Sequence, residues 1–227
     1  MLEIAPTSTW INAYPGASIG LLEVSGVENH LPSPALAAQK RQVEEGLRQT
    51  YAGFTRPDFI ALPVLAAYRG YYKKFDMTYH VQLQLESLVL KGKCLPAVSP
   101  LVDANFSAEL ETLVLTAGHD ADLLFPPVTI DVTAPGDEFV QMNGTLKALR
   151  PADMCMKDSS GIVCTILYGQ DNHSPITPAT THALYVAYAP AGVSRAQVEL
   201  HLTAILANIR LFAPRCAVAQ IGVLSAG

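Results

Sequence analysis

The apolar pattern of this sequence changes near Pro126. Upstream, apolar residues recur mostly at helical spacing, and the clearest helix is expected over 33–51, with Ser33 as its N-cap and Pro34 in its first turn. Downstream, short strand-like runs alternate with turn-forming pairs such as Asn143-Gly144. Helices first and strands later predict an α+β fold rather than a regular alternation of strands and helices.

Other elements of the N-terminal part are also expected. Residues 16–29 read as a strand, and 56–72 read as a helix interrupted at Pro63. Residues 78–93 alternate like a strand in places, but their length and the terminal Gly92 favour a helix.

The chain is expected to continue with a helix over roughly 99–113 that leads into a turn at Gly118. A strand at 181–190 and an amphipathic helix at 194–212, capped by Ser194, are expected after the short strands.

Size and composition limit the class of protein. With 227 residues, the chain is expected to form a single domain, in which 1–95 supplies a strand and helices and 96–227 forms the pocket. Although 50% of the residues are hydrophobic, no uncharged run approaches the length needed to cross a bilayer. The N-terminus has no export signal, so a cytoplasmic protein with no membrane partner is expected.

Several classes of chemistry are disfavoured by the sequence. It has no P-loop, no dinucleotide-binding glycine motif, no His-Glu-x-x-His and no nucleophile elbow. The spacing of its histidines and four cysteines predicts no metal site, and buried reduced thiols are expected; no cofactor is predicted.

The net charge of −5 argues against a broad basic surface for nucleic acid. Local basic clusters remain as weak candidates for tRNA contact, although cations at ordinary helix ends are the favoured explanation. These residues are Arg69, Lys73, Lys74, Lys91 and Lys93.

The candidate site combines a histidine with a polar loop. His119 lies between Gly118 and Asp120 after an apolar run, and the loop 167–182 contains Gly169 among polar residues. Glycines in such places let a ligand approach the backbone, so these segments are candidates for a binding pocket. A half-exposed histidine in an ordinary turn is the simpler alternative.

Four segments in a fixed order resemble a known family. They are LPAVSPLVDANFSAEL, LTAGHDADLL, the stretch from VTIDVTAPGDEF to CTILYG, and ITPATTHALYVAYAP. Together they are similar to the editing domain of the bacterial phenylalanyl-tRNA synthetase beta subunit, the B-three/B-four domain, which also occurs as free-standing proteins. The resemblance implies a three-layer core, with an antiparallel or mixed β-sandwich-like part flanked by helices.

The resemblance also implies a site. His119 would be the catalytic residue that positions water or the tRNA ribose, and a neutral imidazole suits this task at pH 7. The amino-acid cavity would be formed by Gly118, Asp120, Tyr168, Gly169, Gln170, Thr177, Thr180 and Tyr188. The family's glutamate that recognises a tyrosine hydroxyl has no counterpart in 181–190, so tyrosine specificity is not carried over; Tyr185 or Tyr188 would occupy its space.

Three functions follow from these expectations. The first is an aminoacyl-tRNA deacylase that hydrolyses the ester of mischarged tRNA, with tRNA and an amino acid as its partners. The second is a non-catalytic module that binds tRNA or an amino acid on the same scaffold. The third is an unrelated small-molecule protein that has kept the fold. A complete tRNA ligase is excluded, because the chain lacks the parts that would activate an amino acid.

Overall fold

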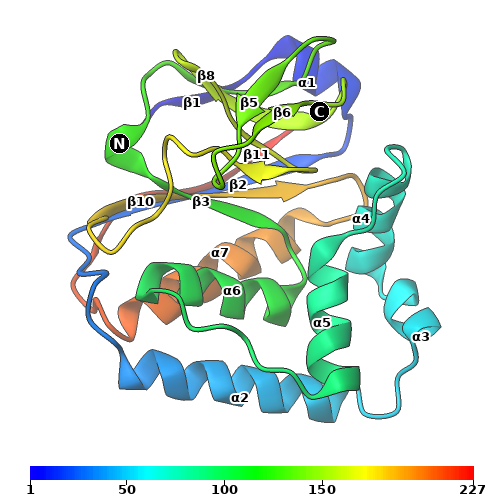
Figure 1. Cartoon of the computed structure of the whole chain (residues 1–227), viewed down its shortest axis with the longest axis vertical. Helices are drawn as coiled ribbons and strands as arrows, with labels where there is room; N and C mark the ends of the chain where they lie inside the picture. Colours follow the sequence, from blue (N-terminus) through cyan, green and yellow to red (C-terminus); the bar gives the residue numbers. More distant parts are fainter.

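The computed structural model describes residues 1–227 and is built around a four-stranded antiparallel sheet in the order β11-β2-β10-β3 (Figure 1). Both faces of its central strands are covered, which explains why β2 and β10 read as nearly continuous apolar runs. The bounds are β2 Ser18–Ser25, β3 Thr116–Asp120, β10 His182–Ala189 and β11 Ala217–Ser225.

The second layer is a five-stranded sheet in the order β1-β4-β7-β8-β9, accompanied by the β5–β6 hairpin. Only β1 pairs in parallel, with β4; the other pairs are antiparallel. The bounds are β1 Ile4–Pro6, β4 Val128–Val132, β5 Glu138–Val140, β6 Leu146–Ala148, β7 Met154–Asp158, β8 Gly161–Thr165 and β9 Gly169–Gln170.

Helices form the third layer. Helices α6 and α7 lie against the four-stranded sheet on the face away from the second sheet, and α2 packs beneath α6 (Figure 1). The bounds are α1 Ser8–Ala13, α2 Pro34–Thr50, α3 Arg56–Ala61, α4 Pro63–Lys73, α5 His80–Lys91, α6 Pro100–Thr112, the 3₁₀ turn η1 Ala121–Leu123, and α7 Arg195–Arg210. The α+β class and the layered core are confirmed.

The local capping signals are confirmed. The Ser33 hydroxyl accepts a hydrogen bond from Leu36 N at 3.2 Å, and the Ser194 hydroxyl accepts one from Gln197 N at 3.2 Å. Gly92 ends α5 in a left-handed conformation with φ 63°, which favours glycine. The helical interpretation of 78–93 is therefore correct, and the chain also breaks between α3 and α4 at Pro63.

The expected turn at Gly118 is wrong. Helix α6 ends at Thr112, Leu113 takes the left-handed conformation, and Gly118 lies inside strand β3. Space there is tight, because an added Cβ would lie 2.7 Å from Ile176 Cδ1 and the end of that side chain would have to shift. The expectation of buried thiols holds for Cys155 and Cys164 but is wrong for Cys94, which is exposed, and for Cys216, which is half-buried.

Two edge strands were not expected from the sequence. Strand β1 pairs with β4, and β11 pairs with β2, so each depends on a partner far away along the chain. Nor is there any helix with the length and apolar character that crossing a bilayer requires.

Candidate functional site

A cavity of about 320 Å³ lies beside the free edge of β3. Among the strands of its sheet, β3 pairs only with β10. Its other edge makes one isolated bridge, between His119 and Pro175, and residues of α6, β8 and β9 line the cavity beside it. The lining residues are His80, Val98, Val102, Asn105, Phe106, Leu115, Thr116, Ala117, Gly118, Met142, Cys164, Thr165, Ile166, Gly169, Gln170, Ile176, Tyr185 and Tyr188. A mostly apolar cavity with a few polar groups is typical of a small-molecule site.

The wall of this cavity carries no Asp, Glu, Lys or Arg side chain. Partial desolvation lowers the pKa of His80, which favours the neutral form of its ring. The side chain of Asn105 is 5% exposed, and its Oδ1 has no hydrogen-bond partner within the protein. Because unpaired buried polar atoms are costly, Asn105 Oδ1 is a natural acceptor for a ligand.

The backbone of β3 contributes a further polar group to the cavity. Tyr188 N donates to Leu115 O at 2.9 Å, so Leu115 is bonded to β10. In an antiparallel pair, the N–H groups of successive residues point alternately to the partner strand and to the opposite edge. Thr116 and Asp120 consequently direct their N–H groups to the free edge, where they donate to Glu109 Oε1 at 2.7 Å and Ser174 O at 2.9 Å. By the same alternation, the N–H of Gly118, which lies between them and lines the cavity, is directed to this edge.

His119 lies on the face of β3 that is turned toward the second sheet, and its side chain is fully buried. Its Nδ1 lies 2.8 Å from Ser174 Oγ and 3.2 Å from Gln170 Nε2. An amide nitrogen only donates, so Nδ1 is the acceptor and the ring proton lies on Nε2. Burial lowers the pKa of His119 to about 3, so the ring is neutral at pH 7.

Comparison with known proteins identifies the family of the chain. The family model of the B3/4 domain matches residues 66–206, which is more than half of the chain and includes every element of the cavity. The chain belongs to the B3/4 domain family. This membership confirms the resemblance seen in the sequence.

A solved structure shares the fold of this B3/4 domain. It is an N-terminal fragment of the phenylalanyl-tRNA synthetase beta-subunit from Pyrococcus horikoshii, with a TM-score of 0.50 and 9% sequence identity. The match covers 96% of this chain and 50% of that fragment, so this chain spans about half of its length. No curated protein matches by sequence.

Four of the residues expected at the pocket line the cavity of the B3/4 domain: Gly118, Gly169, Gln170 and Tyr188. His119 does not line it and reaches it only through Gln170. Tyr185, expected as an alternative to Tyr188, lines the cavity as well.

The other expected pocket residues organise the neighbouring loop. The Thr180 hydroxyl donates to Asp120 Oδ2 at 2.7 Å and accepts from Thr177 N at 2.9 Å. The ring of Tyr168 lies 4.7 Å from Lys147 Nζ. None of these four residues lines the cavity.

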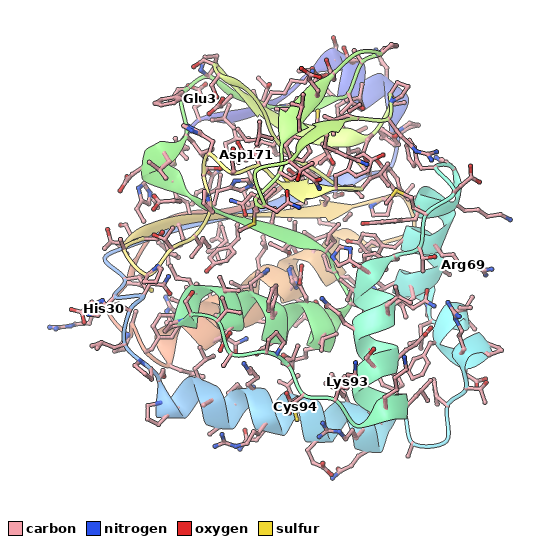
Figure 2. All side chains as sticks on the ribbon, viewed as in Figure 1. Glu3, His30, Arg69, Lys93, Cys94 and Asp171 are labelled. Atoms are coloured by element: carbon pink, nitrogen blue, oxygen red, sulfur yellow. The ribbon has the colours of Figure 1, made fainter.

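The five basic residues do not converge on the cavity. Lys73 ends α4 and Lys74 follows it directly, whereas Lys91 and Lys93 lie at the C-terminal end of α5, and none of the four lines the cavity. Arg69 and Lys93 are far apart on the surface (Figure 2). Lys93 alone lines a cavity adjoining this one.

Several lining residues were not expected at the pocket. Asn105 and Phe106 lie in α6, Thr116 begins β3, and Met142 lies between β5 and β6. Behind them, Glu109 is fully buried, and burial raises its pKa to about 8, so its carboxyl is mostly protonated at pH 7. The only sequence signal for a buried carboxyl at Glu109 was its place within an apolar helix.

Proposed function

We propose that this B3/4 domain hydrolyses the ester bond between an amino acid and tRNA, releasing mischarged amino acid. The observation that carries the proposal is the cavity at the edge of β3, where an unpaired buried amide oxygen and a backbone N–H directed to that edge lie in a mostly apolar wall. The family and the fold relate this domain to a phenylalanyl-tRNA synthetase beta-subunit fragment, which supports a tRNA-related substrate. We expect the protein to act in the cytoplasm, where aminoacyl-tRNA is used.

The wall favours an amino acid with an uncharged side chain. No carboxylate or cation lines the cavity, and strand β10 supplies tyrosines at positions 185 and 188 instead of an acidic residue. A buried site without a charged partner disfavours a charged side chain, because the desolvation is not repaid. The α-amino group of the ester would donate to Asn105 Oδ1.

In the proposed reaction, water attacks the ester carbonyl carbon and the carbonyl oxygen becomes negative. The bond to the ribose oxygen then breaks, leaving a free amino acid and a tRNA whose terminal hydroxyl has taken up a proton. The Gly118 N–H is placed to stabilise the oxygen, as backbone donors do in oxyanion holes. Gln170 would orient the water.

His119 acts in this scheme as a positioning residue. Its Nδ1 accepts from Gln170 Nε2, which also donates to Ser174 O at 2.6 Å. These two acceptors fix the orientation of the Gln170 amide beside the cavity. A neutral imidazole performs this role without a change of charge, in agreement with the low pKa of His119.

A non-catalytic binding module is the second candidate. It is favoured by the same burial of His119, which keeps the only histidine of the Gly-His-Asp element away from the substrate, and by the lack of a carboxylate in the wall. Such a module would hold the amino-acid end of tRNA without turnover.

Deacylation of a panel of radiolabelled aminoacyl-tRNAs, correctly and incorrectly charged, tests the proposal. We expect selective release by the wild type and at least a tenfold lower rate in both His119→Ala and Gln170→Ala. His30→Ala, at an exposed position (Figure 2), is the control and should keep the wild-type rate. Tight binding without release from any member of the panel would refute hydrolysis and favour the binding module.

A further inference from the structure

A second cavity of about 330 Å³ adjoins the first. It lies between α5 and the segment 93–96, and its wall includes Leu83, Ser87 and Lys93. His80 and Phe106 line both cavities, so the two adjoin at these rings, and we refer to the two cavities together as the channel.

The outer wall of this channel is the segment 92–99, which joins α5 to α6 without regular secondary structure. Lys93 to Pro96 border the second cavity, and Val98 borders the first. One segment therefore shapes both ends of the channel.

Helix α2 holds this segment in place through three side chains on one face. Lys40 Nζ donates to Pro96 O at 2.6 Å, Glu44 Oε1 accepts from Leu95 N at 2.7 Å, and Arg48 Nη2 donates to Lys93 O at 3.1 Å. Lys40 and Glu44 are themselves buried. Three backbone groups of the segment bonded by side chains of one neighbouring helix indicate a defined wall rather than an incidental gap.

The two parts of the channel differ in chemistry. The wall of the first has no Asp, Glu, Lys or Arg side chain. The wall of the second includes Lys93, the polar side chains of Gln84 and Ser87, and the rings of His80 and Phe106 that it shares with the first. Figure 2 shows Lys93 beside Cys94, near the end of α5 that faces α2. Aromatic planes suit a stacked base, and a lysine suits a phosphate.

We propose that the channel binds the aminoacyl-adenosine end of tRNA as one ligand. The amino acid occupies the first cavity, the terminal adenosine occupies the second next to His80 and Phe106, and Lys93 contacts the phosphate of that nucleotide. This inference rests on the proposed function and adds the place of the nucleoside to it.

The probes are stable 3′-amide analogues of aminoacyl-adenosine carrying leucine or phenylalanine, compared with the N-methylamides of the same amino acids. NMR titration measures both Kd values, including millimolar ones. We expect the adenosine to tighten binding at least tenfold in the wild type.

Leu83→Trp is designed to fill the second cavity, and Leu90→Trp is its matched control. Both leucines lie in α5 and are similarly exposed, at 40% and 48%, but only Leu83 lines the cavity. Leu83→Trp should remove the tenfold gain while leaving the Kd of the N-methylamides unchanged, and Leu90→Trp should keep the gain. A 5′-phosphate on the analogue should tighten binding further in the wild type and in Lys91→Gln, but not in Lys93→Gln.

The outcomes separate the two proposals. If the N-methylamides bind but adenosine adds nothing, or if its gain survives in Leu83→Trp, the inference is overturned and the proposed function stands. If neither class of probe binds the wild type, the proposed function fails, and the inference fails with it.

Discussion

Two histidines lie on opposite faces of β3, and they differ in how completely their rings are bonded. His201 on α7 contacts the hydroxyl of Thr112 through Nδ1 at 2.7 Å and that of Thr116 through Nε2. His119 uses only Nδ1, and its Nε2 has no partner. Both rings are fully buried, and burial lowers the pKa of each to about 3.

This difference in hydrogen bonding distinguishes His201, which has a structural role, from His119, which is connected to the cavity. His201 joins α7 to the end of α6 and to β3, and both of its ring nitrogens are satisfied. His119 is bonded to Gln170, which lines the cavity, and keeps one unsatisfied donor. Burial and a low pKa are shared, so neither property identifies a functional histidine; the bonding partners do.

Lowering the pH should reduce the stability of the fold through both histidines, and this is the largest effect that we expect. The unfolded chain binds each proton near the ordinary pKa of 6.5, whereas the folded pKa is about 3. The stability contributed by each neutral ring is therefore full above pH 6.5 and is lost as the pH falls toward 3, at about 1.4 kcal/mol per pH unit.

Urea unfolding between pH 7 and pH 4 measures this loss. In His119→Gln and in His201→Gln, the free energy of unfolding should fall with pH less steeply than in the wild type, by about 1.4 kcal/mol per pH unit. His30→Gln, at an exposed position, is the control. A wild-type slope in either buried variant would show that its ring is not held neutral.

Replacement by alanine should distinguish the two histidines at neutral pH. We expect His201→Ala to lower the free energy of unfolding by about 3 kcal/mol, because two buried hydroxyls lose a partner and a cavity remains. His119→Ala should cost roughly 1 kcal/mol less, since its ring is bonded through only one nitrogen. Urea unfolding at pH 7 measures both values, and an equal or reversed order would contradict the comparison.

A substitution in the backbone of β3 itself, at Gly118, is expected to lower stability less than either histidine substitution. In Gly118→Ala, the new Cβ would lie 2.7 Å from Ile176 Cδ1 and 3.2 Å from Tyr185 Cε1, so we expect a loss of about 1–2 kcal/mol. Gly222 in β11 is the matched control, because a Cβ there meets nothing within 4 Å. Thermal unfolding of Gly118→Ala and Gly222→Ala measures the difference, and equal Tm values would show that β3 has room at this position.

The helices of this domain were readable from local chemistry. Ser33, Gly92 and Ser194 act within one turn of their own helices, so their roles follow from sequence spacing. The edge strands β1 and β11 were missed because their stability depends on pairing with β4 and β2. Such pairing leaves little trace in a short window of sequence.

The site was predictable only in part for the same reason. Gly118, Gly169, Gln170 and Tyr188 were expected at a pocket and line the cavity. Asn105, Phe106 and Met142 were not expected there, because they come from a helix and a hairpin that carry no pocket signal of their own.

Local patterns along the chain were sufficient for the α+β class, the helix ends and the order of motifs that relates this domain to its family. The caps and the individual motifs depend on residues a few positions apart, and their order is read directly along the chain. The pairing of β3 with β10 decided which way His119 faces, and the approach of α5, α6 and the second sheet to its free edge created the cavity. Those contacts join residues that are distant in sequence, and the energy that selects them comes from packing the whole core.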